Sequence, residues 1–410
     1  MTLPKSGRIQ ARWVFPVCCP PIENGYVEIE NGLIAAVGAC DGKATDARTV
    51  DLGNVAVLPG LVNAHAHLEF SDLISPIEPP QPFTEWIANL MAYRRGRQMP
   101  VRQLVSDGWA ECLRTGTRTI GEIMTTDDPL LDVLPSDGQF VAFRECIAPV
   151  PERIPGQIEL AQEHLRRCRD AHASGRSIIG GLSPHAPYTV VLELLQQLID
   201  LACRESALVA MHLAETPAEL EYLQYRTGHF RQMLERLGLW RDELHPDGRR
   251  PLDYLKLLAT LPRSLAVHGN YLDDDEVRFL VDHPQVAIVY CPRTHRYFGH
   301  APHRWRELLE RGASVAIGTD GRSSNPDYSL WGELKLLDEL TAGQMRPVIL
   351  ELGTIRGARA LGLGASTGDL SVGKRADLCC VELPQRDDTD PWRLLFDVTS
   401  VSEAELSRHR

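Results

Sequence analysis

The chain has 410 residues, of which 43% are hydrophobic and 24% are charged, and its formal net charge is −12 at pH 7. This length suffices for one large domain with a smaller one attached, and the composition is that of a folded globular protein. The acidic excess excludes an extended nucleic-acid-binding surface, which needs a stripe of Lys and Arg.

The cysteines and apolar segments indicate neither secretion nor membrane insertion. The ten cysteines form no C-x-x-C pattern, which is typical of reduced thiols in the cytoplasm, and the adjacent pairs 18–19 and 379–380 are expected to be buried. No stretch reaches the ~18 apolar residues of a membrane span, and the apolar run 13–19 is too short for a signal peptide. We expect a cytoplasmic protein that binds neither nucleic acid nor a membrane. A homodimer is one of the oligomeric states that the sequence leaves open.

Short β patterns occupy both ends of the chain. Residues 8–17 and 25–38 contain β runs, and Asn31-Gly32 between two such runs predicts a tight hairpin. Residues 368–383 show the same pattern. We predict that residues 1–56 and 366–410 form one composite β-sandwich domain, with residues 57–365 inserted between them as a second domain.

The inserted segment alternates β runs with helical patterns, such as 189–202 and 303–312, where Gly312 is expected to end the helix. Eight β runs are predicted, which end near His67, Glu122, Arg144, His185, His212, His268, Cys291 and Asp320. Eight β/α units predict an α/β fold of the (β/α)8 TIM-barrel type, whose active site lies where the strands end.

Two segments interrupt this alternation. Residues 217–262 are much longer than one β/α unit and contain helical patterns at 228–240 and 251–259. We interpret them as a helical insert over the barrel mouth, either a lid and substrate wall or an oligomer contact. The Pro-rich run 75–83 is predicted to be a loop that leads into a helix at 84–95.

Potential metal ligands stand at the ends of several predicted strands. His65 and His67 are separated by one residue, so both side chains project to the same side of their strand. His212 and Asp320 each follow another β run. Three imidazoles and one carboxylate predict a site for one divalent metal ion, Zn²⁺ or alternatively Fe²⁺, with room for a water molecule whose pKa falls to about 7.

The motifs resemble those of the amidohydrolase superfamily, in the branch that includes cytosine, guanine, S-adenosylhomocysteine and aminofutalosine deaminases. They are P-G-L-V-N-A-H-A-H-L-E-F-S (59–71), S-P-H-A-P-Y (183–188), H-L-A-E (212–215), V-H-G-N-Y-L (267–272) and G-T-D (318–320). The first is most similar to the aminofutalosine-deaminase-like group, and the resemblance covers nearly the whole chain.

The resemblance implies a hydrolytic deaminase with a one-metal site. Glu215, three residues beyond His212, would carry the proton from water to the ring nitrogen, His268 would donate to the attacking oxygen, and Asp320 would also orient the water. Two-metal relatives such as dihydroorotases use a carboxylated Lys, and no Lys occurs between residues 44 and 255. A bridging Glu122 or Glu145 is the alternative that stays open.

The substrate is the least determined part of this hypothesis. The leading candidate is 6-aminodeoxyfutalosine of menaquinone biosynthesis. Rivals are a deaminase or chlorohydrolase of S-adenosylhomocysteine, methylthioadenosine, guanine or a triazine, a two-metal cyclic amidase, and a scaffold without activity. Substrate contacts are predicted for His185, Glu69 (alternatively a support for a ligand His), Arg144 and Trp86. Arg293, Arg322 and the cluster His295, His300 and His303 are further candidates with structural alternatives.

Overall fold

The computed structural model describes residues 6–40, 49–126, 138–244 and 248–399, so the predicted terminal domain lies outside the described residues at 1–5, 41–48 and 400–410. The chain divides into two compact units. One comprises residues 1–63, 110–119 and 329–410, and the other comprises residues 64–109 and 120–328. The sequence-predicted domain boundaries at 56/57 and 365/366 stay a prediction.

Strands from both ends of the chain form one six-stranded sheet in the order β14-β5-β1-β2-β3, with β4 paired to β1. Its strands are β1 (Gly7–Val14), β2 (Ile22–Glu30), β3 (Leu33–Ala39), β4 (Thr49–Asp51), β5 (Val55–Pro59) and β14 (Leu378–Glu382). The predicted hairpin is confirmed: Asn31 and Gly32 join β2 to β3 with φ values of 53° and 77°, the left-handed pair that a two-residue turn requires. The inner face buries apolar side chains such as Ile9, Val27 and Leu378.

The ten cysteines are all free thiols. In β14, Cys379 is buried as expected and Cys380 is half-buried, but the prediction for Cys18 and Cys19 was wrong because both are exposed. They follow Pro16 in the connection after β1, where the chain leaves the strand and no longer contributes alternate side chains to the core.

Eight parallel strands form the predicted barrel, in unbroken sequence order. They are β6 (Leu61–Ala66), β7 (Thr117–Met124), β8 (Gln139–Cys146), β9 (Ile178–Pro184), β10 (Leu208–Leu213), β11 (Ser264–His268), β12 (Val286–Tyr290) and β13 (Val315–Ile317). The first and last strands meet where the His65 carbonyl accepts hydrogen bonds from the N–H groups of Thr319 and Asp320, both at 3.1 Å. This seam carries two of the predicted site residues.

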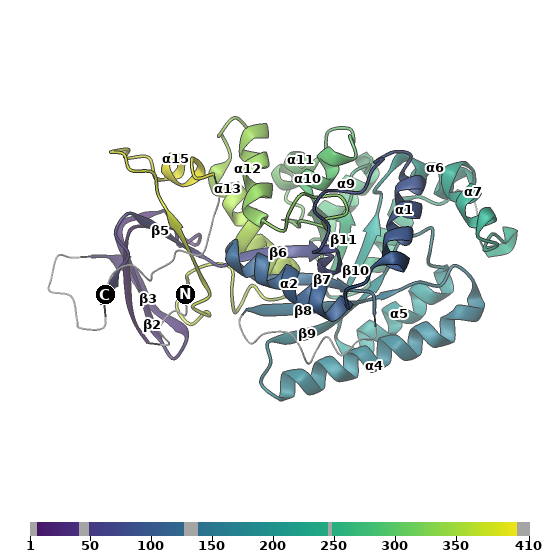
Figure 1. Cartoon of the computed structure of the whole chain (residues 1–410), viewed down its shortest axis with the longest axis horizontal. Coiled ribbons are helices and arrows are strands. Elements are labelled where there is room, and N and C mark those ends of the chain that lie inside the picture. Colours follow the sequence, from purple (N-terminus) through teal and green to yellow (C-terminus); the bar gives the residue numbers. More distant parts are fainter. Residues whose placement is uncertain (1–5, 41–48, 127–137, 245–247, 400–410) are drawn as a thin grey trace. The chain divides into compact units, whose positions relative to one another are not determined.

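Helices alternate with the strands, and Figure 1 shows α4 and α5 alongside β8 and β9, on which they pack. The helices are α1 (Phe83–Gly96), α2 (Val101–Arg114), α4 (Ile154–Ala173), α5 (Leu192–Glu205), α6 (Pro217–Tyr225), α7 (Gly228–Arg236), α8 (Pro251–Leu258), α9 (Asp274–Asp282), α10 (Pro292–Tyr297), α11 (Trp305–Glu310), α12 (Leu330–Leu340), α13 (Arg346–Glu351), α14 (Gly357–Ala360) and α15 (Pro391–Phe396). Helix α11 ends before Gly312, which has a φ of 90°, as predicted.

The predicted helical insert at 217–262 contains α6, α7 and α8. Helix α7 contacts α1, the helix that follows the Pro-rich loop. Within the described ranges, no helix combines the length and the apolar composition that crossing a membrane requires.

The seam of the barrel depends on a residue without a side chain. A Cβ atom at Gly318 would lie 2.6 Å from the His65 carbonyl oxygen and 2.8 Å from its Cβ. We predict that Gly318→Ala lowers the free energy of unfolding by about 1–3 kcal/mol, the usual cost of overpacking. Urea unfolding followed by circular dichroism measures this change.

The matched control is Gly156→Ala in α4, where a Cβ would meet no atom within 4 Å. This substitution should leave stability unchanged or raise it by up to about 1 kcal/mol, because Ala is the better helix former. Equal unfolding midpoints for Gly318→Ala and the wild type would show that the seam has room for a methyl group.

Candidate metal centre and active-site cavity

Three strands, β6, β10 and β13, bring the predicted metal ligands together at the carboxyl end of the barrel. Two overlapping groups have their possible ligand atoms within 4.8 Å of one another: His65, His212 and His268, and His65, His67 and Asp320. These five residues are between 1% and 8% exposed. The structure therefore gathers the four predicted ligands and adds His268 directly beside them.

The donor set fits a cation. The Nδ1–H of His212 donates to the backbone carbonyl of His185 at 2.9 Å, so Nε2 carries the lone pair. That Nε2 faces Nε2 of His67 at 3.3 Å. Burial, followed by the neighbouring His65, lowers the pKa of His212 to about 3, and the same causes lower the pKa of His67, so both rings are neutral. A metal ion is the natural partner for nitrogen lone pairs that converge in this way.

Asp320 provides the negative charge of this group. Its Oδ1 lies 3.8 Å from His65 Nε2 and 3.7 Å from His67 Nε2. Burial alone would raise the pKa of Asp320, but the three histidines around it outweigh burial and hold the pKa below its ordinary value. The carboxylate is therefore ionised and available as a ligand.

The backbone at the site is strained. His268 and Asp320 have φ values of 72° and 60°, and Ala214, beside Glu215, has a φ of 54°. Such values cost about 1–3 kcal/mol for residues other than Gly and are found mainly at functional sites. His303 stabilises the backbone conformation of His268, since its Nε2 lies 2.9 Å from the carbonyl oxygen of His268. The three strand ends are therefore held in conformations that aim their side chains at a common point.

Glu215 lies beside this group, with Oε1 of its carboxylate 3.4 Å from His268 Nε2. Burial, and then the charges of Asp320 and Glu219, raise its pKa well above the ordinary value. Its peptide is fixed from two sides: its N–H donates to Glu219 at 2.8 Å, and its carbonyl accepts from Asn270 at 3.0 Å. The arrangement presents a rigidly held, proton-binding carboxyl group next to the ligand set.

Sequence reasoning missed Glu219. The signal was present in T-P-A-E (216–219), the capping-box pattern of a helix N-terminus. Thr216 does cap α6 by accepting from the N–H of Glu219, but the Glu219 carboxylate extends to the N–H groups of Ala214 and Glu215. The helix cap thereby becomes a support for the loop that carries Glu215.

A cavity of about 1160 Å³, partly open to solvent, lies over this group. Its walls are mainly apolar and come largely from α1 and the insert, whose helix α7 contributes Met233 and Leu234. The insert therefore forms part of the cavity wall, one of the two predicted alternatives. Trp86 also lines the cavity, and its indole N–H donates to the Ser323 carbonyl at 3.2 Å.

Polar side chains are concentrated on one side of the cavity. His185 lines it, with Nδ1 2.6 Å from the Thr189 hydroxyl and Nε2 3.9 Å from Oε1 of Glu145. Burial lowers the pKa of His185 to about 3. Glu145, which the sequence suggested only as a metal bridge, lines the same wall, and burial raises its pKa while the charge of Arg94 acts against this.

Glu69 and Arg144 are not among the described residues that line the cavity. The Glu69 carboxylate binds Arg94 at 2.6 Å, Arg97 at 2.5 Å and the Thr125 hydroxyl at 2.9 Å. Arg144 is buried next to Glu145 in β8, and successive strand residues point to opposite sides.

The other basic candidates lie outside this lining as well. Arg293 pairs with Asp327 at 2.8 Å, and Arg322 donates to the Leu73 carbonyl at 2.9 Å. His295 contacts the Ala301 carbonyl, and His300 contacts the Tyr271 hydroxyl. Together with His303, these side chains support the loops around β11 and β12.

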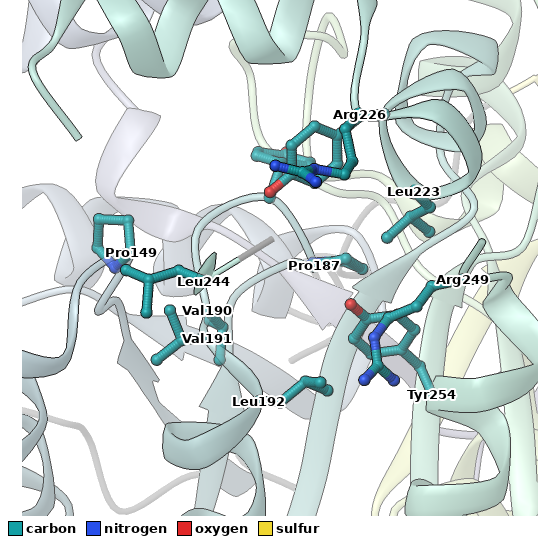
Figure 2. A pocket seen from close by; sticks show the side chains of 12 residues that line it. Pro149, Pro187, Val190, Val191, Leu192, Leu223, Arg226, Leu244, Arg249 and Tyr254 are labelled. Atoms are coloured by element: carbon teal, nitrogen blue, oxygen red, sulfur yellow. The ribbon is translucent and has the colours of Figure 1, made fainter. Parts of the chain in front are cut away.

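A second, much smaller hollow adjoins the cavity, and Pro149 and Tyr188 line both. Figure 2 shows its side chains, among them Arg226, Arg249 and Tyr254. Tyr188 also stacks on Phe230 of α7 with 3.9 Å between ring centroids. This contact ties the insert to the loop that carries His185.

Comparison with known proteins assigns the chain to a family. The amidohydrolase family model matches residues 56–405. A 5-methylthioadenosine/S-adenosylhomocysteine deaminase of Syntrophobacter fumaroxidans is 31% identical, over 87% of this chain and 80% of the relative. The chain belongs to the amidohydrolase family and is a hydrolase that acts on carbon–nitrogen bonds other than peptide bonds.

Two solved structures are similar to this chain. A zinc-bound adenosine deaminase from Xanthomonas campestris is similar with a TM-score of 0.79 and 25% identity, over 97% of this chain and 90% of that one. The Helicobacter pylori aminofutalosine deaminase in complex with methylthio-coformycin has a TM-score of 0.82 and 23% identity, over 97% of both chains. The second likeness shows the fold.

The buried carboxyl group of Glu219 gives a prediction about pH. Burial raises its pKa from 4.5 to about 7, although the N–H donors of the loop act in the opposite direction. The folded protein therefore holds this proton more tightly than the unfolded chain does. The stabilisation is complete below pH 4.5 and is lost as the pH rises to about 7, by about 3 kcal/mol in total.

We expect Glu219→Gln to lack this pH dependence. The stability of the wild type relative to the variant should fall by about 3 kcal/mol between pH 4.5 and pH 7.5, in urea unfolding at several pH values. Glu221→Gln, exposed on the same helix, should keep the wild-type dependence. Parallel curves for the wild type and Glu219→Gln would contradict the assignment.

Proposed function

We propose that this amidohydrolase is a metal-dependent deaminase of an adenine-containing, nucleoside-like substrate. The observation that carries the proposal is the buried, proton-binding Glu215 beside the converging imidazoles and the ionised carboxylate of Asp320, in a cavity with mainly apolar walls. The relatives named as 5-methylthioadenosine/S-adenosylhomocysteine deaminases support the same reaction class.

His65, His67, His212 and Asp320 would hold one divalent metal ion, with Zn²⁺ as the leading candidate and Fe²⁺ as the alternative. When bound, such an ion supplies a water molecule that ionises near neutral pH. Glu122, the possible bridge for a second ion, already accepts the N–H of Leu68 with both oxygens, at 2.9 and 3.1 Å. This favours a one-metal site over the two-metal cyclic amidase.

The side chains of the chain would divide the proton transfers between them. Glu215 would take the proton of the attacking water, pass it to the purine ring nitrogen, and assist the departure of ammonia. Asp320 would orient the water, and His268 would donate a hydrogen bond to the oxygen as it adds to the ring carbon. The 3.4 Å separation of His268 and Glu215 is compatible with both acting on one reacting centre.

The cavity supports a substrate with an apolar group attached to its sugar. His185 and Trp86 line it and would contact the nucleoside, the indole face by stacking. We keep 6-aminodeoxyfutalosine, and with it menaquinone biosynthesis, as the leading substrate. Methylthioadenosine and S-adenosylhomocysteine are the second candidate, which the 31% identity to a deaminase of these compounds favours. Cytoplasmic location and a homodimer stay predictions of the sequence.

The first test measures ammonia release and metal content together. We expect release from at least one of 6-aminodeoxyfutalosine, methylthioadenosine, S-adenosylhomocysteine and adenosine, and no release from cytosine or guanine. A chelator should abolish activity, and about one equivalent of Zn²⁺ or Fe²⁺ per chain should restore it. Two equivalents together with hydrolysis of hydantoin or dihydroorotate would establish the cyclic amidase instead.

The second test concerns the proton carrier. We predict that Glu215→Gln lowers kcat by about 10²- to 10⁴-fold, the usual contribution of general acid–base catalysis, while the metal content stays at the wild-type level. Glu193→Gln, exposed on α5, serves as the control and should keep full activity. Near-normal turnover by Glu215→Gln would remove the residue from the proton transfer.

A further inference from the structure

Glu145 is a buried carboxyl group that the proposed reaction does not use. It stands at the carboxyl end of β8, is 8% exposed, and lines the active-site cavity. Its nearest charged or ionisable contact is His185, whose Nε2 lies 3.9 Å from Oε1, beyond hydrogen-bond distance. Within the described residues, no group donates a hydrogen bond to this carboxyl group.

Other buried carboxylates of the same unit are supplied with donors. Glu69 binds two arginines, Glu122 accepts a backbone N–H, and Glu219 accepts two. A buried carboxylate without donors is costly, because it has lost its water and gained nothing in exchange. Glu145 shares this condition with Glu215, and both side chains face the cavity. The donors to both carboxyl groups are therefore water in the cavity or a ligand that displaces it.

The charges around Glu145 indicate a neutral ligand. The guanidinium of Arg94 is close enough to act on the pKa of Glu145, and it lines the same cavity. Arg144 also acts on the pKa of Glu145, and Arg153 lines the cavity together with Arg94. A cationic group would therefore approach these guanidinium groups unfavourably. Hydroxyl groups are neutral donors that satisfy a carboxylate at short distance.

The position of Glu145 fits the sugar part of a nucleoside. Glu145 lies 3.9 Å from His185, whose ring centroid is 5.1 Å from that of His212, so it stands beside the converging group. Glu145 belongs to neither of the groups whose donor atoms converge, which separates it from metal binding. A purine whose amino-bearing carbon faces Glu215 extends its sugar away from the metal group.

We propose that Glu145 is a specificity-determining residue that accepts hydrogen bonds from the sugar hydroxyl groups of the substrate; this rests on the proposed nucleoside deaminase function. The apolar walls from α1 and α7 then contact the substituent attached to the sugar, and Glu145 distinguishes substrates by the hydroxyl groups that the sugar carries. Discrimination of this kind is strong because a missing hydroxyl leaves a buried acceptor unpaired.

The experiment compares the fastest-deaminated ribonucleoside of the adenine panel with its 2′-deoxy and 3′-deoxy analogues. The wild type should prefer the ribonucleoside over at least one analogue by about 10- to 100-fold in kcat/KM. Glu145→Gln should lose about the same factor on the ribonucleoside, mainly through KM, and should change the activity on that analogue by less than about threefold. Glu145→Asp should recover part of the preference, and all variants should keep the wild-type metal content.

The control is Glu152→Gln, which removes a carboxylate from the turn that follows β8 without touching the cavity. It should keep the wild-type preference for hydroxyl groups. Equal wild-type activity on all three nucleosides would overturn the proposal without any variant. Equal losses on all three in Glu145→Gln, or loss of metal, would also overturn it while the deaminase function stands. Absence of ammonia release from every adenine compound would overturn both.

Discussion

The structure depends on placing several unprotonated imidazoles and one carboxylate in contact inside a protein core. His67 and His212 face each other with their Nε2 atoms 3.3 Å apart, and Asp320 lies 3.7 Å from His67. Bringing such groups out of water is unfavourable unless a cation satisfies their lone pairs. The site is therefore built for a metal ion, and the surrounding backbone shows the constraint directly. Left-handed φ values at His268 and Asp320 persist only because neighbouring contacts fix them.

One short turn links the metal ligands to the substrate wall. Glu69 follows His67 by two residues, and its carboxylate binds both Arg94 and Arg97 at the end of α1. The same turn is held to β7, since the N–H of Leu68 donates to Glu122. Because α1 supplies much of the apolar wall, the turn at 67–69 fixes both the position of that wall and the position of His67. Glu69, for which a substrate contact or support of a ligand His was expected, lies outside the cavity lining and connects this turn to α1.

The sequence predicted the barrel and the converging group well because both follow from simple periodicity. Strand residues alternate between two sides, so H-x-H at a strand end places His65 and His67 together, and parallel strands end at one rim. The same rule could not choose between Arg144 and Glu145, which are adjacent in β8. Arg144 was favoured for its charge, yet Glu145 is the one that lines the cavity. Moving along a strand by one residue changes which side of the sheet the side chain faces. In a strand that is buried at every position, the hydrophobic pattern does not show which residues face the cavity.

The cavity combines a broad apolar surface with a small number of polar groups, and this division explains how one site could be both permissive and selective. Apolar contacts with α1 and α7 discriminate weakly between substituents of similar size, by about 1–3 kcal/mol for each methylene. Buried polar groups such as His185 and Glu145 discriminate strongly, since an unmatched partner is left without a hydrogen bond. Substrate choice should therefore depend more on how the substrate's hydrogen-bonding groups match the polar side chains near β8 and β9 than on the volume of the cavity. Under the proposed function, the insert helix α7 can then vary in sequence and alter the tolerated substituent without changing the proton transfer assigned to Glu215.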